Sequence, residues 1–100
     1  MRIAIAANKK DMNSMVGEVA GRAPFYLIFE NKELIKTIKN PFAVGGGGAG
    51  FGVVKMLEKE KVNVLIVGKI GGNLQSALDS ANMKFQQENN KSINQIVEEL

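Results

Sequence analysis

A chain of 100 residues, 45% hydrophobic and 23% charged, is long enough to bury one hydrophobic core and has a typical globular composition. It contains no cysteine and no histidine, which excludes disulfides, thiolate ligands and nucleophilic catalysis that depends on a Cys-His or Ser-His pair. The net charge of +3 comes from scattered lysines with few arginines, which favours a solvated surface over a nucleic-acid interface.

The first half of the chain predicts three strands. Arg2–Ala6 alternates in hydrophobicity and is followed by a polar loop, as expected for a strand that enters a turn. Pro24–Glu30 is rich in aromatic and β-branched residues, and Glu33–Lys39 alternates loosely after the polar pair Asn31–Lys32. The second and third segments therefore predict an antiparallel hairpin, which Asn40–Pro41 closes.

The second half predicts helices that alternate with strands. The helical spacing i, i+3, i+4, i+7 occurs twice, first at Gly50, Val53, Val54 and Leu57, and again at Leu74, Ala77, Leu78 and Ala81. Val62–Val67 is an almost continuous apolar run, typical of a strand buried on both faces. Met83–Gln86 fits a short edge strand, and Ser92–Gln95 has the form of a capping box for a last helix that reaches Leu100.

The resulting order β-β-β-α-β-α-β-α predicts an α/β sandwich around a mixed sheet, with a hairpin first and parallel crossovers later. In such sheets the loops that leave the carboxyl ends of strands form the usual ligand crevice. Two glycine-rich loops precede helices here, Gly45–Gly50 and Gly68–Asn73. We therefore expect a ligand crevice bordered by these two loops.

The first glycine loop contains Gly45, Gly47 and Gly50 in the dinucleotide-binding pattern G-x-G-x-x-G. That pattern needs a carboxylate after the next strand, and Val67–Ile70 offers none; a phosphate-binding P-loop fails too, because no Lys-Ser/Thr follows the glycines. Two interpretations remain open. Free amides at the helix N-terminus bind an anion, or the glycines only let the helix pack closely on its neighbours.

Two cationic side chains have both a functional and a structural interpretation. Arg22 and Lys69 could each supply a cation to a bound anion, or lie in ordinary surface contacts. Asn73 is most simply the N-cap of the second helix.

The loop after the first strand holds the remaining candidate ligands. Met12 and Met15 could offer soft sulfur to a metal, although methionine more often fills apolar gaps. Asp11 and Glu18 could act as hard ligands, but their spacing is not specific.

Three segments occur in a familiar order: Ser14–Glu30 with its Gly-Arg-Ala-Pro and aromatics, the glycine-rich Asn40–Gly50, and Val62–Leu78 with Gly-Lys-Ile-Gly-Gly-Asn. Together they resemble the dinitrogenase iron–molybdenum cofactor biosynthesis family, the group of NifX- and NafY-like domains and the related C-terminal part of NifB proteins. The resemblance covers nearly the whole chain, so we expect residues 1–100 to form one domain of this kind.

The resemblance implies a three-layer α/β/α, ribonuclease H-like fold with a mixed five-stranded sheet. It implies a non-catalytic carrier that binds an iron–molybdenum or iron–sulfur cluster, or its precursor, and passes it between metallocluster assembly proteins. The residues implied at the binding crevice are Arg22, Gly45, Gly46, Gly47, Gly48, Gly50, Gly68, Lys69, Gly71 and Asn73, with Met15 as a candidate metal ligand.

Other features set the expected surroundings and the alternatives. The N-terminus lacks the long apolar stretch of a signal peptide and no apolar run could span a bilayer, so we expect a cytoplasmic protein without membrane partners. We also expect a monomer or weak homodimer without nucleic-acid partners. One alternative is a regulatory or interaction module that binds a small phosphorylated or other anionic ligand at the same crevice. Another is an enzyme that uses Asp11 or Glu18, which would require a cleft carboxylate with a raised pKa.

Overall fold

The structure is a computed structural model that describes residues 1–17, 21–43 and 49–100. The elements, in chain order, are β1 (Arg2–Ala7), β2 (Phe25–Glu30), β3 (Glu33–Lys39), α1 (Ala49–Lys59), β4 (Val64–Val67), α2 (Gly72–Ser80), β5 (Lys84–Gln87) and α3 (Ile93–Glu98). This is the predicted order, and the boundaries differ by one or two residues. Among the described residues, no helix is long and apolar enough to span a membrane.

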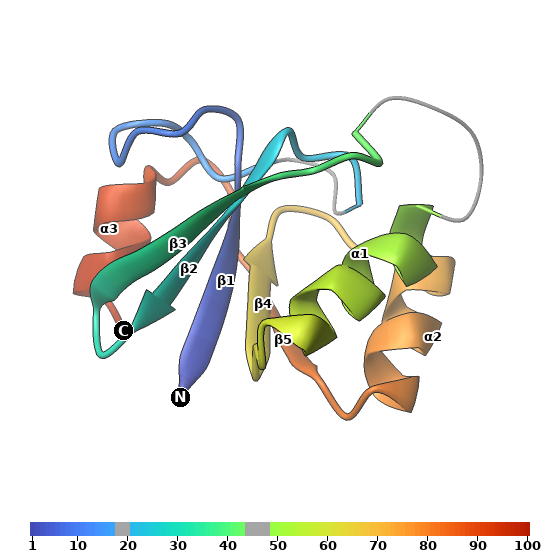
Figure 1. Ribbon diagram of the computed structural model, residues 1–100. Coiled ribbons are helices and arrows are strands. Elements are labelled where there is room, and N and C mark those ends of the chain that lie inside the picture. Colours follow the sequence, from blue (N-terminus) through green and yellow to red (C-terminus); the bar gives the residue numbers. More distant parts are fainter. Residues whose placement is uncertain (18–20, 44–48) are drawn as a thin grey trace.

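The strands form one mixed sheet in the order β3-β2-β1-β4-β5. β1 is antiparallel to β2 and parallel to β4, and β4 is parallel to β5. The carboxyl ends of β1, β4 and β5 therefore share one edge, at the top of Figure 1. The register also brings the end of β3 to this edge, because Phe25 pairs with both Ala7 and Lys39.

Helices cover both faces of the sheet, which confirms the three-layer α/β/α fold (Figure 1). On one face α1 and α2 pack over alternate strand residues that include Ala4, Tyr26 and Leu65. On the other face α3 packs over the intervening ones, such as Ile5 and Ile66. The period of two along each strand sends successive side chains to opposite cores. β4 is buried on both faces, as its apolar run predicts.

Two local predictions are confirmed in detail. Asn31 and Lys32 both have positive φ, of 53° and 65°, which is the geometry of a tight two-residue hairpin turn. At the start of α3, Ser92 Oγ accepts a hydrogen bond from Gln95 N–H, and Gln95 Oε1 accepts one from Ser92 N–H, as in a capping box.

A buried polar network ties the turn before β2 to the end of β3. The Asn40 amide nitrogen donates to the carbonyl oxygens of Gly21 and Ala23, at 2.9 Å each. Its amide oxygen accepts the Phe42 N–H at 2.9 Å. The Tyr26 hydroxyl accepts the Gly21 N–H at 3.0 Å, and Gly21 has a φ of 83°, which glycine adopts without strain. The network thus fixes the Gly-Arg-Ala-Pro turn at the sheet edge.

Tyr26 makes this network sensitive to high pH. Burial raises the pKa of Tyr26 to about 12, although the hydrogen bond from Gly21 acts in the opposite direction. Between pH 10 and 12 the unfolded chain loses the phenolic proton while the folded chain keeps it, so the stability from this group is present below pH 10 and lost as pH rises towards 12.

We expect the stability advantage of the wild type over Tyr26→Phe to shrink by about 2 kcal/mol between pH 9.5 and 12. Urea unfolding of both proteins across this range measures the difference in their free energies of unfolding. The lysines also lose protons in this range, but their contribution is the same in both proteins and cancels. A pH-independent difference would contradict the prediction.

Candidate functional site

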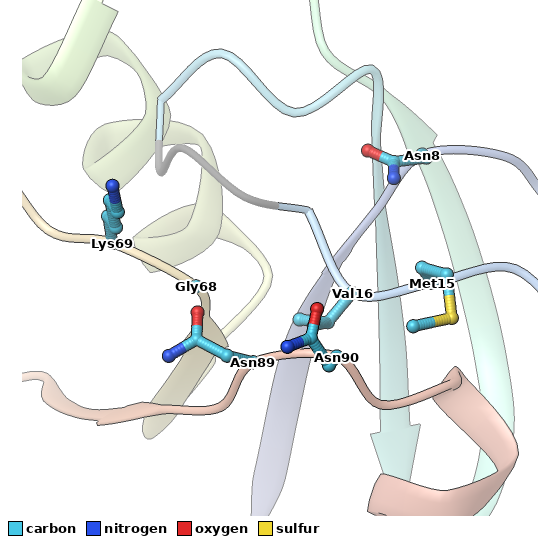
Figure 2. Close-up of a pocket in the computed structure, with 7 residues that line it drawn as sticks. All are labelled: Asn8, Met15, Val16, Gly68, Lys69, Asn89 and Asn90. Atoms are coloured by element: carbon cyan, nitrogen blue, oxygen red, sulfur yellow. The ribbon is translucent and has the colours of Figure 1, made fainter.

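A cleft of about 580 Å³ lies beyond the carboxyl ends of three parallel strands (Figure 2). Asn8 follows β1, Gly68 and Lys69 follow β4, and Asn89 and Asn90 follow β5. Met15 and Val16, from the loop after β1, complete the lining. Open α/β sheets commonly bind ligands at this edge.

Backbone hydrogen bonds hold the loop after β1 across the cleft. Gly17 N–H donates to Ala6 O at 2.7 Å, and Gly17 O accepts the Gly68 N–H at 2.9 Å. Val16 N–H donates to Lys91 O at 2.9 Å. The segment therefore bridges the ends of β1 and β4 and the chain after β5.

The asparagine side of the cleft is tied to β4 and α3. Glu88 N–H donates to Val67 O at 2.9 Å, and Lys91 Nζ forms ion pairs with Glu88 at 2.6 Å and Glu99 at 2.7 Å. The hydrogen bond from Lys91 lowers the pKa of Glu88. Asn90 has a φ of 56°, in the left-handed region that asparagine tolerates.

The lining combines one cation, three carboxamides and one thioether. Lys69 is exposed, and Met15 keeps 42% of its surface accessible. Figure 2 shows Lys69 and Met15 on opposite sides, with Asn89 and Asn90 between them. This arrangement can hold a polar anion through charge and amide hydrogen bonds and can offer it a soft sulfur. Met12, by contrast, packs against the core under α3 as apolar filler.

The candidate carboxylate Asp11 does not line this cleft. Asp11 lies in an exposed turn, where its carboxylate accepts the Asn13 N–H at 2.9 Å. Glu18 lies outside the described residues. Within residues 1–17, 21–43 and 49–100, no group of three or more acidic side chains could hold a metal ion.

The structure brings three of the predicted site residues into the cleft: Met15, Gly68 and Lys69. The amide of Gly68 already donates to Gly17, so Gly68 shapes the cleft without offering its N–H to a ligand. Arg22 is exposed in the turn before β2, on the same sheet edge but not in the lining. Gly45, Gly46, Gly47 and Gly48 lie outside the described residues, and their role stays a prediction.

Gly50 has a packing role, which was one of the two interpretations left open. A Cβ at this position would lie 3.2 Å from the backbone nitrogen and Cα of Leu74, so glycine lets the starts of α1 and α2 come into close contact. Gly71 is exposed, and a Cβ there would meet no atom within 4 Å.

The prediction that Asn73 caps α2 is wrong. The helix begins at Gly72, and the N-cap is Gly71, which is extended and accepts the first helical hydrogen bond from Gln75 N–H at 3.0 Å. Asn73 is therefore the second helical residue, and no side chain caps this helix.

Sequence reasoning missed four residues that matter here. Asn8, Asn89 and Asn90 could have been found as polar residues directly after expected strands. Gly17 gave no comparable signal, because its importance arises from contacts with Ala6 and Ala23.

The whole chain, residues 1–100, matches the protein family described as dinitrogenase iron-molybdenum cofactor. The chain belongs to this family. The resemblance seen in the sequence motifs is thus confirmed. None of the curated proteins matches this dinitrogenase iron–molybdenum cofactor family member significantly in sequence.

Solved structures agree with the family assignment. The apo form of the orange protein from Desulfovibrio gigas superposes with a TM-score of 0.89 at 25% identity, covering 97% of this chain and 83% of that one. A NifB-like protein from Thermotoga gives a TM-score of 0.83 at 26% identity, covering 97% and 84%. The fold of this chain is therefore shared with both of these proteins over 97% of its length.

Proposed function

We propose that the protein binds an anionic iron–sulfur or iron–molybdenum–sulfur cluster in the cleft and carries it between assembly proteins without catalysing a reaction. One observation carries this proposal. In this family member the cleft is lined both by the exposed ammonium group of Lys69 and by the accessible thioether of Met15. The ammonium offsets the negative charge of the cluster, and thioether sulfur is a soft donor.

The donor set fits a cargo held briefly. Carboxamide N–H groups of Asn8, Asn89 and Asn90 can donate to the sulfides of a cluster. Because the chain has no cysteine or histidine, it offers no thiolate or imidazole that would bind iron tightly. Weak holding suits a carrier, which must release its cargo.

Retention of isolated iron–molybdenum cofactor under anaerobic conditions tests the proposal. After gel filtration, we expect Lys69→Glu to retain at least fivefold less iron and molybdenum than the wild type, and Met15→Leu two- to fivefold less. Lys84→Glu is the control, because it makes the same charge change at the amino-terminal end of β5, away from the cleft. Its metal retention is expected to stay within twofold of the wild type. The proposal fails if the wild type retains no more metal than the Lys69→Glu/Met15→Leu double variant.

A small phosphorylated ligand is the second candidate, because Lys69 and the three asparagines could equally contact phosphate oxygens. Met15 separates the two proposals, since a thioether adds nothing to phosphate binding. If a nucleotide or phosphometabolite raises the melting temperature of Met15→Leu as much as that of the wild type, the second candidate is favoured.

A further inference from the structure

Positive charge is concentrated on the sheet edge that carries the cleft. Lys9 and Lys10 follow β1, Lys39 ends β3, and Lys69 follows β4. Arg22 precedes β2, whose first residue pairs with the last residue of β1. We call these five residues the basic rim.

The rest of the chain carries no excess charge. Apart from the rim, and from Asp11 and Glu18 in the loop after β1, the sequence contains eight basic and eight acidic residues. The five rim cations together with Asp11 and Glu18 therefore account for the whole net charge of +3. Glu18 is included here from the sequence alone. Such an imbalance produces a directional field around a small protein.

The rim lysines form no ion pair with another described residue. Among the described residues, the ion pairs are Arg2–Glu30, Lys36–Glu60, Lys91–Glu88 and Lys91–Glu99, and none includes Lys9, Lys10, Lys39 or Lys69. Lys10 instead lies over the Phe25 ring, with its Nζ 5.6 Å from the ring centroid. All four lysines are exposed. Their ammonium groups are thus available to an external anionic surface.

We propose that the basic rim is a docking surface for an acidic face of a partner protein, which covers the cleft when cargo is transferred. The identity of that cargo rests on the proposed function. Cations that lie at and beside a pocket speed the encounter with an acidic partner and help to orient it over the opening.

The rim fits an acidic protein better than a nucleic acid. Four of its five members are lysines, whereas base and phosphate recognition favours arginine. The nearby aromatic rings are also engaged: Lys10 lies over Phe25, and the ring of Phe42 fills the space beside Gly52.

A charge-matched pair of triple variants tests the docking surface. The rim variant is Lys9→Glu/Lys10→Glu/Lys39→Glu, and the control is Lys55→Glu/Lys59→Glu/Lys84→Glu, which changes the net charge equally on exposed residues elsewhere. The probe is a fluorescein-labelled decaglutamate peptide, followed by anisotropy at low ionic strength, with a single-stranded dodecanucleotide as the nucleic-acid probe.

We expect the rim variant to bind the peptide at least tenfold more weakly than the wild type, and the control less than threefold more weakly. Equal losses in both variants, or no peptide binding by the wild type, would overturn the proposal. Tighter binding of the oligonucleotide than of the peptide, lost in the rim variant, would assign the rim to nucleic acid instead.

The rim variant keeps Lys69 and Met15, so its retention of isolated iron–molybdenum cofactor should stay within twofold of the wild type. This readout separates the two proposals. If the wild type does not bind the peptide, the docking surface is refuted and the test of cluster binding is unaffected. If the wild type does not retain the cluster, the proposed function is refuted and the peptide result still stands.

Discussion

Replacing Asn40 by aspartate is expected to lower the free energy of unfolding by about 4 kcal/mol. Asn40 is 3% exposed, and its amide nitrogen donates to the carbonyl oxygens of Gly21 and Ala23. An ionised aspartate would place a buried negative charge against these two oxygens. A protonated aspartate could donate to only one of them, so the other carbonyl would stay unpaired in a site without water access.

The control for this prediction is Asn73→Asp, the same chemical change at an exposed position in the first turn of α2. A carboxylate there interacts favourably with the helix dipole, so we expect a change within about 0.5 kcal/mol. Urea unfolding at pH 7 measures both variants. Similar stabilities for the two variants would show that the Asn40 network contributes little.

Replacing Gly17 by alanine is expected to lower the free energy of unfolding by about 2 kcal/mol. The added Cβ would lie 2.9 Å from the Ala23 Cβ and 3.2 Å from the Ala6 Cβ, both buried, and the first distance is shorter than real contacts allow. The backbone cannot move away without weakening the hydrogen bonds from Gly17 to Ala6 and from Gly68 to Gly17. The same movement would shift the neighbouring Met15 in the cleft.

Gly72→Ala is the matched control, because a Cβ at Gly72 would meet no atom within 4 Å. Alanine in the first turn of α2 should be neutral or stabilise by up to about 1 kcal/mol. Thermal or urea unfolding compares the variants, and equal stability of Gly17→Ala and Gly72→Ala would refute the close packing at Gly17. Metal retention by Gly17→Ala should also fall, since the cleft lining moves.

These contacts give two of the sequence motifs a structural meaning. Gly21–Pro24 is one of the family markers, with Arg22 as a predicted binding residue, and Asn40–Pro41 is predicted to close the hairpin at the start of the glycine-rich segment. In the structure the first motif supplies the carbonyl acceptors and the second supplies the amide donor. The two motifs therefore meet in one buried, hydrogen-bonded corner at the sheet edge.

The sequence by itself determined the order of strands and helices, the hairpin turn and the capping box at Ser92. These features depend on interactions within a few residues, so periodicity and local hydrogen bonding specify them. The cap of α2 was mispredicted because the helix starts at Gly72, one residue before the asparagine that looked like its cap. Exposed glycines at Gly71 and Gly72 give no local signal for where the first turn begins.

Only the tertiary structure decided which residues form the cleft and which glycines are there for packing. Asn8, Met15, Gly68 and Asn89 are far apart in the chain, and they meet because β1, β4 and β5 run parallel and end at one edge. Gly17 and Gly50 contact residues that are distant in the sequence. Gly17 O accepts a hydrogen bond from Gly68 N–H, and Gly50 packs against Leu74. Such contacts depend on how the sheet and its helices pack, and no local pattern in a single sequence encodes them.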